Sequence, residues 1–516
     1  MSRHAPSALP LIVTLDPDSR HTRYRQIFDA IRQAILAGRL PPGTQVPSTR
    51  ALAAQLRVAR STVVLAYEHL IAEGYLTGST GSGSYVARDL PDLTPAPARP
   101  SARPRAKPSG RRPVAARADQ YVAAIIGAPF SNRSPVPFRL GEPAVDLFPV
   151  KIWRQLYQRR WRVTPHALMR YGDPEGFRPL RREIVDYLSA ARGVKAAVDQ
   201  VILVRGTQQA LDLAARVLLN PGDPVWVEDP GYMSTRATLD AAGARVVPVP
   251  VDAEGLVVDD GERMAPAARA AFVAPSHQYP LGVTMSLARR LELLDWARRA
   301  DAWIVEDDFD SEFRYAGQPQ LALHGLDAED RVIYVGTFSK TLFPALRLGY
   351  MVVPRDLARA FQMGRTLADY LSPTVEQAVV ADFLAEGHFA RHVRRMRTVY
   401  AARQQALVAA AERELDGLLR IEPAAVGMHV VGWLRDDISD HAAFRAALDA
   451  GIETPPLSRY CRQATLPPAL LFGYSAVTER TIAAAARRLR PVLQGVAPRP
   501  RGVPRRPPAA SGIKKS

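Results

Sequence analysis

The stretch VGTFSKTLFPALRLGY, residues 335–350, decides how the larger part of this chain is interpreted. It continues from the apolar run RVIYVG, which is typical of a buried parallel strand. Ligands of open α/β sheets bind where loops leave the carboxyl ends of such strands. Lys340 therefore stands at the edge of a predicted sheet. Thr337, Ser339 and Arg347 beside it supply two hydroxyls and a guanidinium that suit a phosphate.

Lysine is rare in this chain, because arginine supplies nearly all of the positive charge. Between the two basic ends of the chain the lysines are Lys151, Lys195 and Lys340. The first two lie in polar, helix-rich sequence, whereas Lys340 lies among residue types that bind phosphate. A lysine beside a phosphate site is the arrangement needed to form a Schiff base with pyridoxal phosphate. The alternative is a surface lysine in a Ser/Thr loop.

Three further motifs place chemistry at the ends of predicted strands. In EDDFDSEFRY, Asp307 follows an apolar run and supplies a carboxylate for a protonated pyridine nitrogen. In VRGTQQALDL, a Gly-Thr turn opens a helix whose first N–H groups suit an anion. In EDPGY, Tyr232 stands just after a strand, where it can stack on a planar ring. Each motif alone is common, but the four together in one domain indicate one cofactor site.

The hydrophobic pattern divides the chain into a head, a linker and a two-part body. Residues 11–87 predict a small α+β unit, and residues 88–118 are a linker rich in Pro, Arg and Ala. Residues 136–374 alternate apolar runs with helical stretches, which predicts a large doubly wound α/β domain. Residues 375–495 predict a smaller α+β lobe, and residues 496–516 are a basic tail that we expect to be disordered.

The head has the pattern of an α+β winged helix-turn-helix, with three helices followed by two short strands. Ser48 and Ser61 are expected to cap the second and third helices. The buried face of the third helix is expected to consist of Val63, Tyr67, Leu70 and Ile71.

The third helix of such a unit enters the DNA major groove with its first residues at the base edges. Arg60, Ser61 and Thr62 stand there, with a side-chain fork and two hydroxyls that suit bases and phosphates. Arg50, at the start of the second helix, suits a backbone phosphate, and Gly83 lets the wing approach DNA closely. The alternative is a protein-interaction module in which these polar residues are only caps.

The net charge of +17 is concentrated at the two ends of the chain. Residues 1–118 carry 17 Arg or Lys against 7 Asp or Glu, and residues 499–516 carry 6 Arg or Lys and no acid. The body between them is therefore nearly neutral. Basic ends on a neutral body predict that the head binds a polyanion such as double-stranded DNA, with solvated disordered segments as the alternative.

Composition also excludes several classes of protein. A single cysteine, Cys461, rules out internal disulfides and cysteine clusters for zinc, so we expect no metal site. The chain has no run of about 18 apolar residues, so we expect no membrane span, and its beginning does not have the form of a signal peptide. We expect a cytoplasmic protein that associates with the nucleoid when it binds DNA.

Residues 38–86, which include the motifs PPG, PSTR, RST and LIAEG, strongly resemble the DNA-binding domain of the GntR family of bacterial regulators. The combination of these motifs is specific to that family. The resemblance implies that the DNA contacts come from Arg50, Arg60, Ser61, Thr62 and Gly83.

From about residue 138 to 490 the body resembles the fold-type I aminotransferases. The motifs that carry this resemblance are RLGEPAVDLFP, YGDPEGFRPLR, GTQQALDL, EDPGY, APSHQYPLG, EDDFDSEFRY, GTFSKTLFPALRLGY and LLFGYS. The whole layout is similar to the MocR subfamily of GntR regulators, in which a winged helix is joined to an aminotransferase-like domain. The resemblance implies that Lys340 forms the Schiff base, Asp307 pairs with the pyridine nitrogen and Tyr232 stacks on the ring. The residues implied to hold the phosphate are Gly206, Thr207, Gln208, Ser339, Arg347 and, in a homodimer, Tyr171 of the partner subunit.

The chain departs from working transaminases at several places. Phe309 stands in place of a tyrosine, and Tyr279 in place of an asparagine, that hydrogen-bond the phenolic oxygen of the cofactor. LLFGYS, residues 470–475, lacks the arginine that clamps a substrate carboxylate. Arg459 is a candidate replacement, with a surface arginine as the alternative. His277 is either a residue that positions the ring or a structural histidine.

Two functions follow from these residues. The first is a transcription regulator whose head binds DNA and whose body senses pyridoxal phosphate, or an amine or amino acid through the Schiff base. The second is a working aminotransferase with an accessory DNA-binding head. Phe309 and the missing arginine favour the regulator, so at most weak transamination is expected. The intact set of Lys340, Asp307 and Arg347 disfavours a body that serves only for dimerisation.

Overall fold

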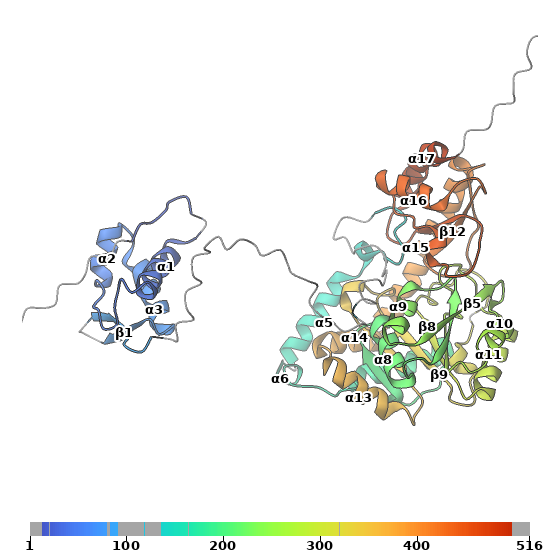
Figure 1. The fold of residues 1–516 in the computed structure, drawn as a ribbon, viewed down its shortest axis with the longest axis horizontal. Coiled ribbons are helices and arrows are strands. Elements are labelled where there is room, and N and C mark those ends of the chain that lie inside the picture. The colour runs from blue at the N-terminus through green and yellow to red at the C-terminus, as the bar shows by residue number, and fades with distance from the viewer. Residues whose placement is uncertain are drawn as a thin grey trace, which may run out of the picture. The chain divides into compact units, whose positions relative to one another are not determined.

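The chain divides into two compact units, Met1–Pro113 and Val114–Ser516, which we describe separately (Figure 1). The predicted linker and the predicted basic tail lie almost entirely outside the described residues. The computed structural model describes residues 13–19, 21–79, 83–90, 118, 136–163, 165–318 and 320–497.

The N-terminal unit consists of three helices and a two-stranded hairpin. Its elements are α1 (Arg23–Leu36), α2 (Thr49–Leu56), α3 (Arg60–Ala72), β1 (Leu76–Ser79) and β2 (Gly83–Val86). The two strands pair antiparallel, with Leu76 opposite Val86. Apolar side chains of all three helices bury one shared core, which explains why the short helices are stable together. This arrangement confirms the predicted winged helix-turn-helix.

The helix ends of this unit confirm one predicted cap and correct the other. The Ser48 hydroxyl accepts a hydrogen bond from the Ala51 N–H at 3.2 Å, as an N-cap does. The prediction that Ser61 caps α3 is wrong, because the helix already begins at Arg60 and Ser61 lies exposed in its first turn. The prediction that Ile71 is buried is also wrong. It is 42% exposed, because it stands at the edge of the helix face that packs on the core.

The C-terminal unit is built on an eight-stranded mixed sheet with the order β3-β10-β9-β8-β7-β4-β5-β6 (Figure 1). The strands are β3 (Val201–Val204), β4 (Pro224–Asp229), β5 (Arg245–Asp252), β6 (Gly255–Leu256), β7 (Ala270–Val273), β8 (Trp303–Asp308), β9 (Val332–Thr337) and β10 (Gly349–Val352). The central strands β5, β4, β7, β8 and β9 run parallel, so their carboxyl ends share one edge. β10 is antiparallel to both β9 and β3.

Helices cover both faces of this sheet, as expected for a doubly wound domain. Successive strand residues point to opposite faces, so Val225 and Val227 pack into one core and Trp226 into another, where it stacks on Trp296. One face is covered by α8 (Thr207–Leu218), α9 (Met233–Ala241) and α13 (Ala358–Asp369). The other is covered by α5 (Val150–Val163), α7 (Arg178–Arg192), α10 (Val258–Met264), α11 (Leu287–Arg299) and α14 (Thr374–Ala385).

The end of the chain forms a smaller lobe with its own antiparallel sheet. Its elements are α15 (His388–Glu414), β11 (Leu419–Ile421), β12 (His429–Leu434), α16 (Asp440–Asp449), β13 (Ala469–Gly473) and α17 (Glu479–Val496). The sheet order is β11-β12-β13. Phe138 and Ala144 also belong to the core of this lobe, so the beginning and the end of the body pack together.

The predicted apolar runs of the large sheet correspond to strands β3, β4, β5, β7, β8 and β9. Sequence patterns did not predict β10, because GYMV is only four residues long and directly follows the lysine loop. The remaining short elements are η1 (Val145–Leu147), α6 (Pro165–Leu168), η2 (Val198–Gln200), α12 (Leu323–Leu326), η3 (Pro344–Leu346) and η4 (Leu457–Tyr460). Among the described residues, no helix combines the length and the apolar character needed to cross a membrane.

Candidate functional site

A cavity of about 820 Å³ lies at the carboxyl edge of the large sheet. The predicted site residues that line it are Thr207, Gln208, Tyr232, Asp307, Ser339, Lys340, Arg347 and Arg459. They lie in β8, follow β3, β4 or β9, or come from the small lobe, so the fold brings together motifs that are far apart in the sequence. Lys151 and Lys195 are exposed and do not line this cavity, which leaves Lys340 as its lysine.

Lys340 stands three residues beyond the end of β9 and reaches into the cavity. Its Nζ donates a hydrogen bond to the Gly141 carbonyl oxygen at 2.8 Å. Gly141 has a φ of 71°, and a Cβ at this position would lie 2.5 Å from Nζ, so the contact needs a glycine. Burial lowers the pKa of the Lys340 ammonium, and the nearby Asp310 and Asp307 partly offset this effect. A neutral amine is the form that attacks a carbonyl carbon.

Asp307 is the second chemical group of the cavity. Burial raises the pKa of its carboxyl group to about 7, with Asp308 also raising it and Lys340 lowering it. Oδ1 of Asp307 and Oδ1 of Asp308 are both buried with no hydrogen-bond partner among the described residues, but Asp308 is paired through its Oδ2 with Arg192 at 2.8 Å. A buried carboxylate oxygen without a donor is costly. A protonated ring nitrogen placed in the cavity would supply that donor.

The opposite side of the cavity has the groups of an anion site. Gly206, with a φ of 97°, precedes α8, so the first N–H groups of this helix at Thr207 and Gln208 are free of intrahelical partners. A Cβ on Gly206 would lie 3.7–3.9 Å from the Arg347 guanidinium, which places this cation next to the helix start. The Gln208 side-chain amide donates a hydrogen bond to the Thr238 hydroxyl at 2.6 Å. Ser339 lines the same cavity.

Aromatic side chains form one wall of the cavity. The rings of Tyr232 and Tyr279 meet edge to face at 5.5 Å and 83°. The hydroxyl of Tyr279 donates to the hydroxyl of Tyr460 at 3.3 Å, and Phe309 lines the cavity without a hydroxyl. The resemblance expects hydrogen bonds to the phenolic oxygen of the cofactor from positions 279 and 309. Tyr279 instead bonds to Tyr460, and Phe309 has no hydroxyl.

Arg459 reaches the cavity from η4 of the small lobe. The loop that follows it is held by the carboxylate of Asp229, which accepts three hydrogen bonds from the N–H groups of residues 462–464 at 2.7–2.8 Å. Arg459 has no acidic partner among the described residues. Arg139, which lines the same cavity, is in contrast paired with two glutamates at 2.8 and 3.2 Å. Arg459 is therefore the more available of the two for an anionic ligand.

Tyr171 is the predicted phosphate residue that lies away from the cavity. Its side chain is 86% exposed and packs edge to face on Tyr370, with the ring centroids 5.6 Å apart. A contact between Tyr171 and the cofactor of a partner subunit stays a prediction.

The cavity also contains residues that the sequence patterns did not single out. Asp310 stands three residues after Asp307, and Arg236 stands four residues, about one helical turn, after Tyr232. Their spacing from these predicted residues could have indicated that they also line the cavity. Gly141 lies in RLGEPAVDLFP, a motif of the resemblance that gave it no role, whereas His429 comes from a segment that contains no motif. Only the fold brings these two residues to the cavity that Lys340 lines.

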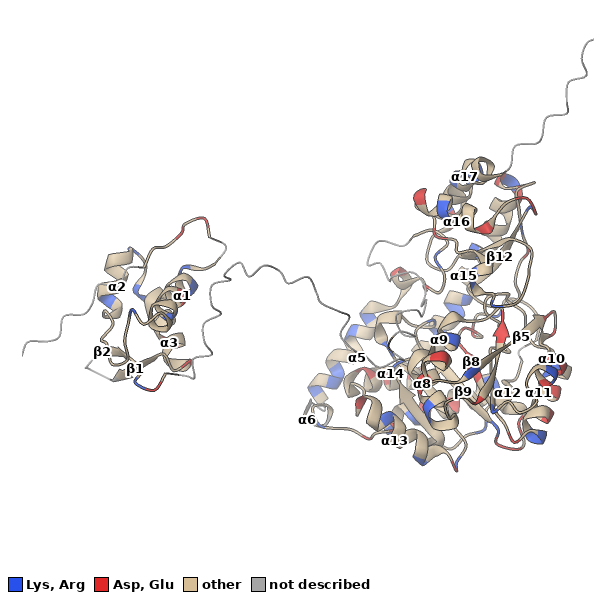
Figure 2. Cartoon of the chain, viewed as in Figure 1, with Lys and Arg blue, Asp and Glu red and all other residues tan. Residues whose placement is uncertain are grey.

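The candidate DNA-binding residues lie on the surface of the N-terminal unit. Arg50, in the first turn of α2, and Arg60, at the start of α3, are exposed, as is Ser61. Figure 2 draws Lys and Arg in blue and shows such residues on α1 and α2 of this unit. Nε of Arg60 donates a hydrogen bond at 3.4 Å to the hydroxyl of Thr49, the first residue of α2, so the starts of α2 and α3 are neighbours. Thr62 is half-buried, and Gly83 begins β2 with a φ of 100°. Their roles on DNA stay predictions.

Comparison with known proteins separates the same two parts. Residues 23–86 match the model of bacterial regulatory proteins of the gntR family, and residues 136–489 match that of aminotransferase class I and II. The chain is 40% identical to the probable rhizopine catabolism regulatory protein MocR of Rhizobium meliloti, over 91% of this chain and 94% of that protein. It is 31% identical to the pyridoxine biosynthesis transcriptional regulator PdxR of Corynebacterium glutamicum, over 92% of this chain and 96% of that protein.

The body also matches solved aminotransferases. One is LysN, an α-aminoadipate aminotransferase of Thermus thermophilus in complex with N-(5'-phosphopyridoxyl)-L-leucine, with a TM-score of 0.64 and 29% identity. The match covers 74% of this chain and 95% of LysN. The fold and the cavity thus define a winged helix-turn-helix head joined to a fold-type I aminotransferase-like body. The chain belongs to the MocR subfamily of the GntR family of bacterial transcription regulators.

Proposed function

We propose that this regulator binds pyridoxal 5'-phosphate covalently through Lys340 and changes its DNA binding when the cofactor or an amino compound occupies the cavity. The observation that carries this proposal is that Lys340, with a lowered pKa, shares one cavity with the unpartnered Oδ1 of Asp307. Burial shifts Lys340 toward its reactive neutral form, and Oδ1 of Asp307 has no hydrogen-bond donor among the described residues. A positively charged heteroaromatic aldehyde satisfies both needs at once.

The residues of the cavity fit the other parts of the cofactor. The start of α8, Ser339 and Arg347 would hold the phosphate, through backbone N–H groups, a hydroxyl and a guanidinium. Tyr232 would cover one face of the ring and Asp307 would accept from its nitrogen. When bound, pyridoxal phosphate supplies a carbonyl carbon that combines with amines and a ring that withdraws electrons. Lys340 supplies the competing amine of the protein.

The amino compound is proposed to lie between the cofactor site and the small lobe. Arg459 is the proposed contact for an acidic group, since it lines the cavity without an acidic partner among the described residues. The Asp229 carboxylate holds the adjoining loop and so positions Arg459 relative to β4. Because Arg459 belongs to the small lobe and Lys340 to the large domain, a ligand that contacts both links the two parts.

Transamination is the alternative function of this body. Phe309 donates no hydrogen bond, and the hydroxyl of Tyr279 is engaged with Tyr460. β13, Ala469–Gly473, contains no arginine. The chain therefore keeps the groups that suit the cofactor and lacks groups that working transaminases use to tune it and to clamp the substrate. These features support a sensor that binds amines over an enzyme that turns them over.

The experiment is a DNA-binding measurement on the full chain, using duplexes that the protein itself selects from a random pool. We expect a panel of amines and amino acids to include compounds that shift the DNA affinity of the wild-type protein several-fold and leave that of Lys340→Ala unchanged. An equal shift in both proteins would contradict a response through Lys340. Sustained turnover of an amino donor with a 2-oxo acid would instead establish the transaminase.

A further inference from the structure

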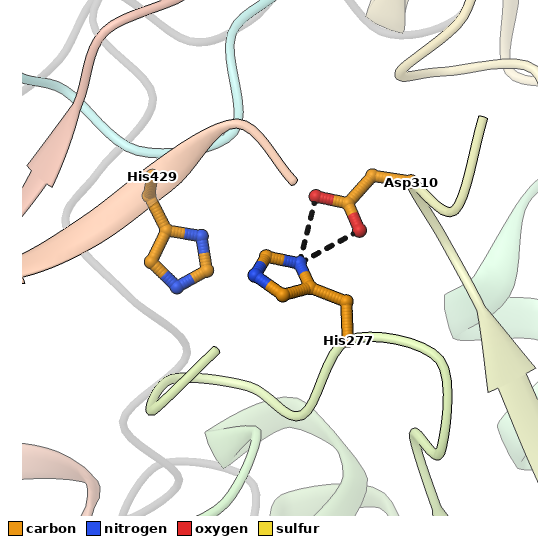
Figure 3. A group of neighbouring side chains, drawn as sticks. All are labelled: His277, Asp310 and His429. Carbon is orange, nitrogen blue, oxygen red and sulfur yellow. Dashed lines mark hydrogen bonds and ion pairs between the residues drawn. The ribbon is translucent and has the colours of Figure 1, made fainter. Parts of the chain in front are cut away.

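A buried cluster of two histidines and one aspartate adjoins the cavity but has no part in the proposed cofactor chemistry (Figure 3). His277 follows β7, Asp310 follows β8 and His429 is the first residue of β12 in the small lobe. All three side chains are buried. One nitrogen from each histidine and one carboxylate oxygen lie within 4.8 Å of one another.

The hydrogen bonds of the cluster fix which nitrogen of each ring carries a proton. Nδ1 of His277 lies 2.8 and 3.1 Å from the two Asp310 oxygens, so it donates and its Nε2 carries a lone pair. Nε2 of His429 lies 3.0 Å from the Pro280 carbonyl oxygen, so it also donates and its Nδ1 carries a lone pair. These bonds leave Nε2 of His277 and Nδ1 of His429 as the ring nitrogens that can face a ligand.

The free acceptor of His277 is not satisfied by the surrounding residues. This atom, Nε2, is buried with no hydrogen-bond partner among the described residues, and it faces the ring of His429 (Figure 3). The ring centroids are 4.9 Å apart. Two imidazole rings and a carboxylate whose ligand atoms lie within 4.8 Å of one another in a protein interior suit a group that accepts electron pairs.

The packing around His277 holds its ring in this orientation. Gly427 lies against the ring, and a Cβ on it would lie 1.9 Å from Cε1 of His277. Histidines that bind metals donate their second nitrogen to a carboxylate or a backbone carbonyl, which fixes the tautomer and the ring. His277 does so to Asp310 and His429 does so to Pro280. Both supporting contacts of a histidine metal site are therefore already present.

We propose that His277 and His429 bind a divalent transition-metal ion, with Zn²⁺ as the probe, and that Asp310 orients His277 and balances the charge of the ion. Imidazole nitrogen is a preferred ligand of Zn²⁺. Asp310 and His429 line the cavity, so the remaining coordination positions face it and are open to water or to a ligand atom. This departs from the expectation of no metal site, because the three residues come from separate segments with no motif spacing.

The test is zinc binding by the untagged full chain after removal of metals with a chelator. Equilibrium dialysis with Zn²⁺ and metal analysis give the number of ions per chain and the affinity. We expect one site, an at least tenfold weaker affinity in His429→Gln, and a roughly 10- to 100-fold weaker affinity in Asp310→Asn. His324→Gln is the matched control, because Nδ1 of His324 is also buried and unpartnered among the described residues but lies outside the cluster.

Co²⁺ gives a readout that does not depend on any variant. Ligand-field absorption of Co²⁺ bound to the wild-type protein through nitrogen ligands would support the site. The spectrum of hydrated Co²⁺ in the presence of excess protein would overturn it. Equal zinc affinity of the wild-type and His429→Gln chains would also overturn it, as would a crystal structure grown with Zn²⁺ in which only water lies between the two rings.

Discussion

Lys340 and Asp307 carry pKa shifts of opposite sign, and both shifts have the same cause. Burial disfavours the charged form of any group, so it lowers the pKa of the lysine and raises the pKa of the aspartate to about 7. The cofactor-free cavity therefore shifts the lysine toward its neutral form and gives Asp307 a carboxyl group that titrates near neutral pH. In the proposed complex, Lys340 would hold pyridoxal phosphate covalently, and the charge of Asp307 would be stabilised by the ring nitrogen.

Replacing Lys340 by alanine removes the amine that we propose to bond the cofactor. We expect Lys340→Ala to lose the absorbance band of the lysine-bound cofactor while it keeps its far-ultraviolet circular dichroism and its affinity for DNA. Lys195→Ala is the matched control, since Lys195 is exposed and away from the cavity. An unchanged band in Lys340→Ala would refute the assignment.

The raised pKa of Asp307 predicts that the stability of the cofactor-free protein depends on pH. Its folded pKa of about 7 lies above the unfolded value, so ionisation destabilises the fold. The penalty is complete above pH 7 and disappears as the pH falls from about 7 toward about 4. We expect Asp307→Asn without cofactor to unfold at higher urea than the wild type at about pH 8, with little difference near pH 4. A constant difference across this range would contradict the assigned pKa.

At the scale of elements, Ser48 and Ser61 stand at similar positions in the sequence but differ in their place on α2 and α3. Ser48 caps α2, and its loss should cost about 1 kcal/mol of head stability. Ser61 lies exposed inside α3, so Ser61→Ala should change stability by less than about 0.5 kcal/mol. Urea denaturation followed by circular dichroism measures both. Equal destabilisation by the two variants would mean that Ser61 also acts as a cap.

Arg60 is the exposed residue at the start of α3 that we expect to read a base. If it does so, Arg60→Ala should weaken binding to the selected duplex by about 1–3 kcal/mol and relax the preference at one base position. Competition with duplexes altered at single positions measures this effect. An equal loss of affinity on every sequence would make Arg60 a phosphate contact.

Local sequence signals predicted most elements and much of the cavity, and failed where long-range packing decides. The strand ends before Tyr232, Asp307 and Lys340 are marked by apolar runs followed by polar residues, so the edge they share was predictable. β10 was missed because a four-residue strand is stabilised by its neighbours on both sides. His429 reaches the cavity only because the small lobe packs against the large domain, and no local pattern reports that contact.

At the scale of the whole molecule, the charge of the chain predicts how DNA binding responds to salt. The net charge of +17 lies almost entirely in residues 1–118 and 499–516. Each phosphate contact adds about 0.9 to the slope of log affinity against log salt. We expect deletion of residues 499–516 to reduce this slope on unrelated duplexes and to leave the sequence preference intact. An unchanged slope would show that the tail does not contact DNA.

The measurement that tests the central claim most directly is borohydride reduction of the full chain in the presence of pyridoxal phosphate, followed by peptide mapping. Reduction fixes the cofactor to the lysine that holds it, and the mass of the modified peptide identifies that residue. We predict one modification per chain, on the peptide that contains Lys340. Modification of Lys151 or Lys195 instead, or of no lysine, would contradict the cofactor site and leave a DNA-binding protein whose signal enters elsewhere.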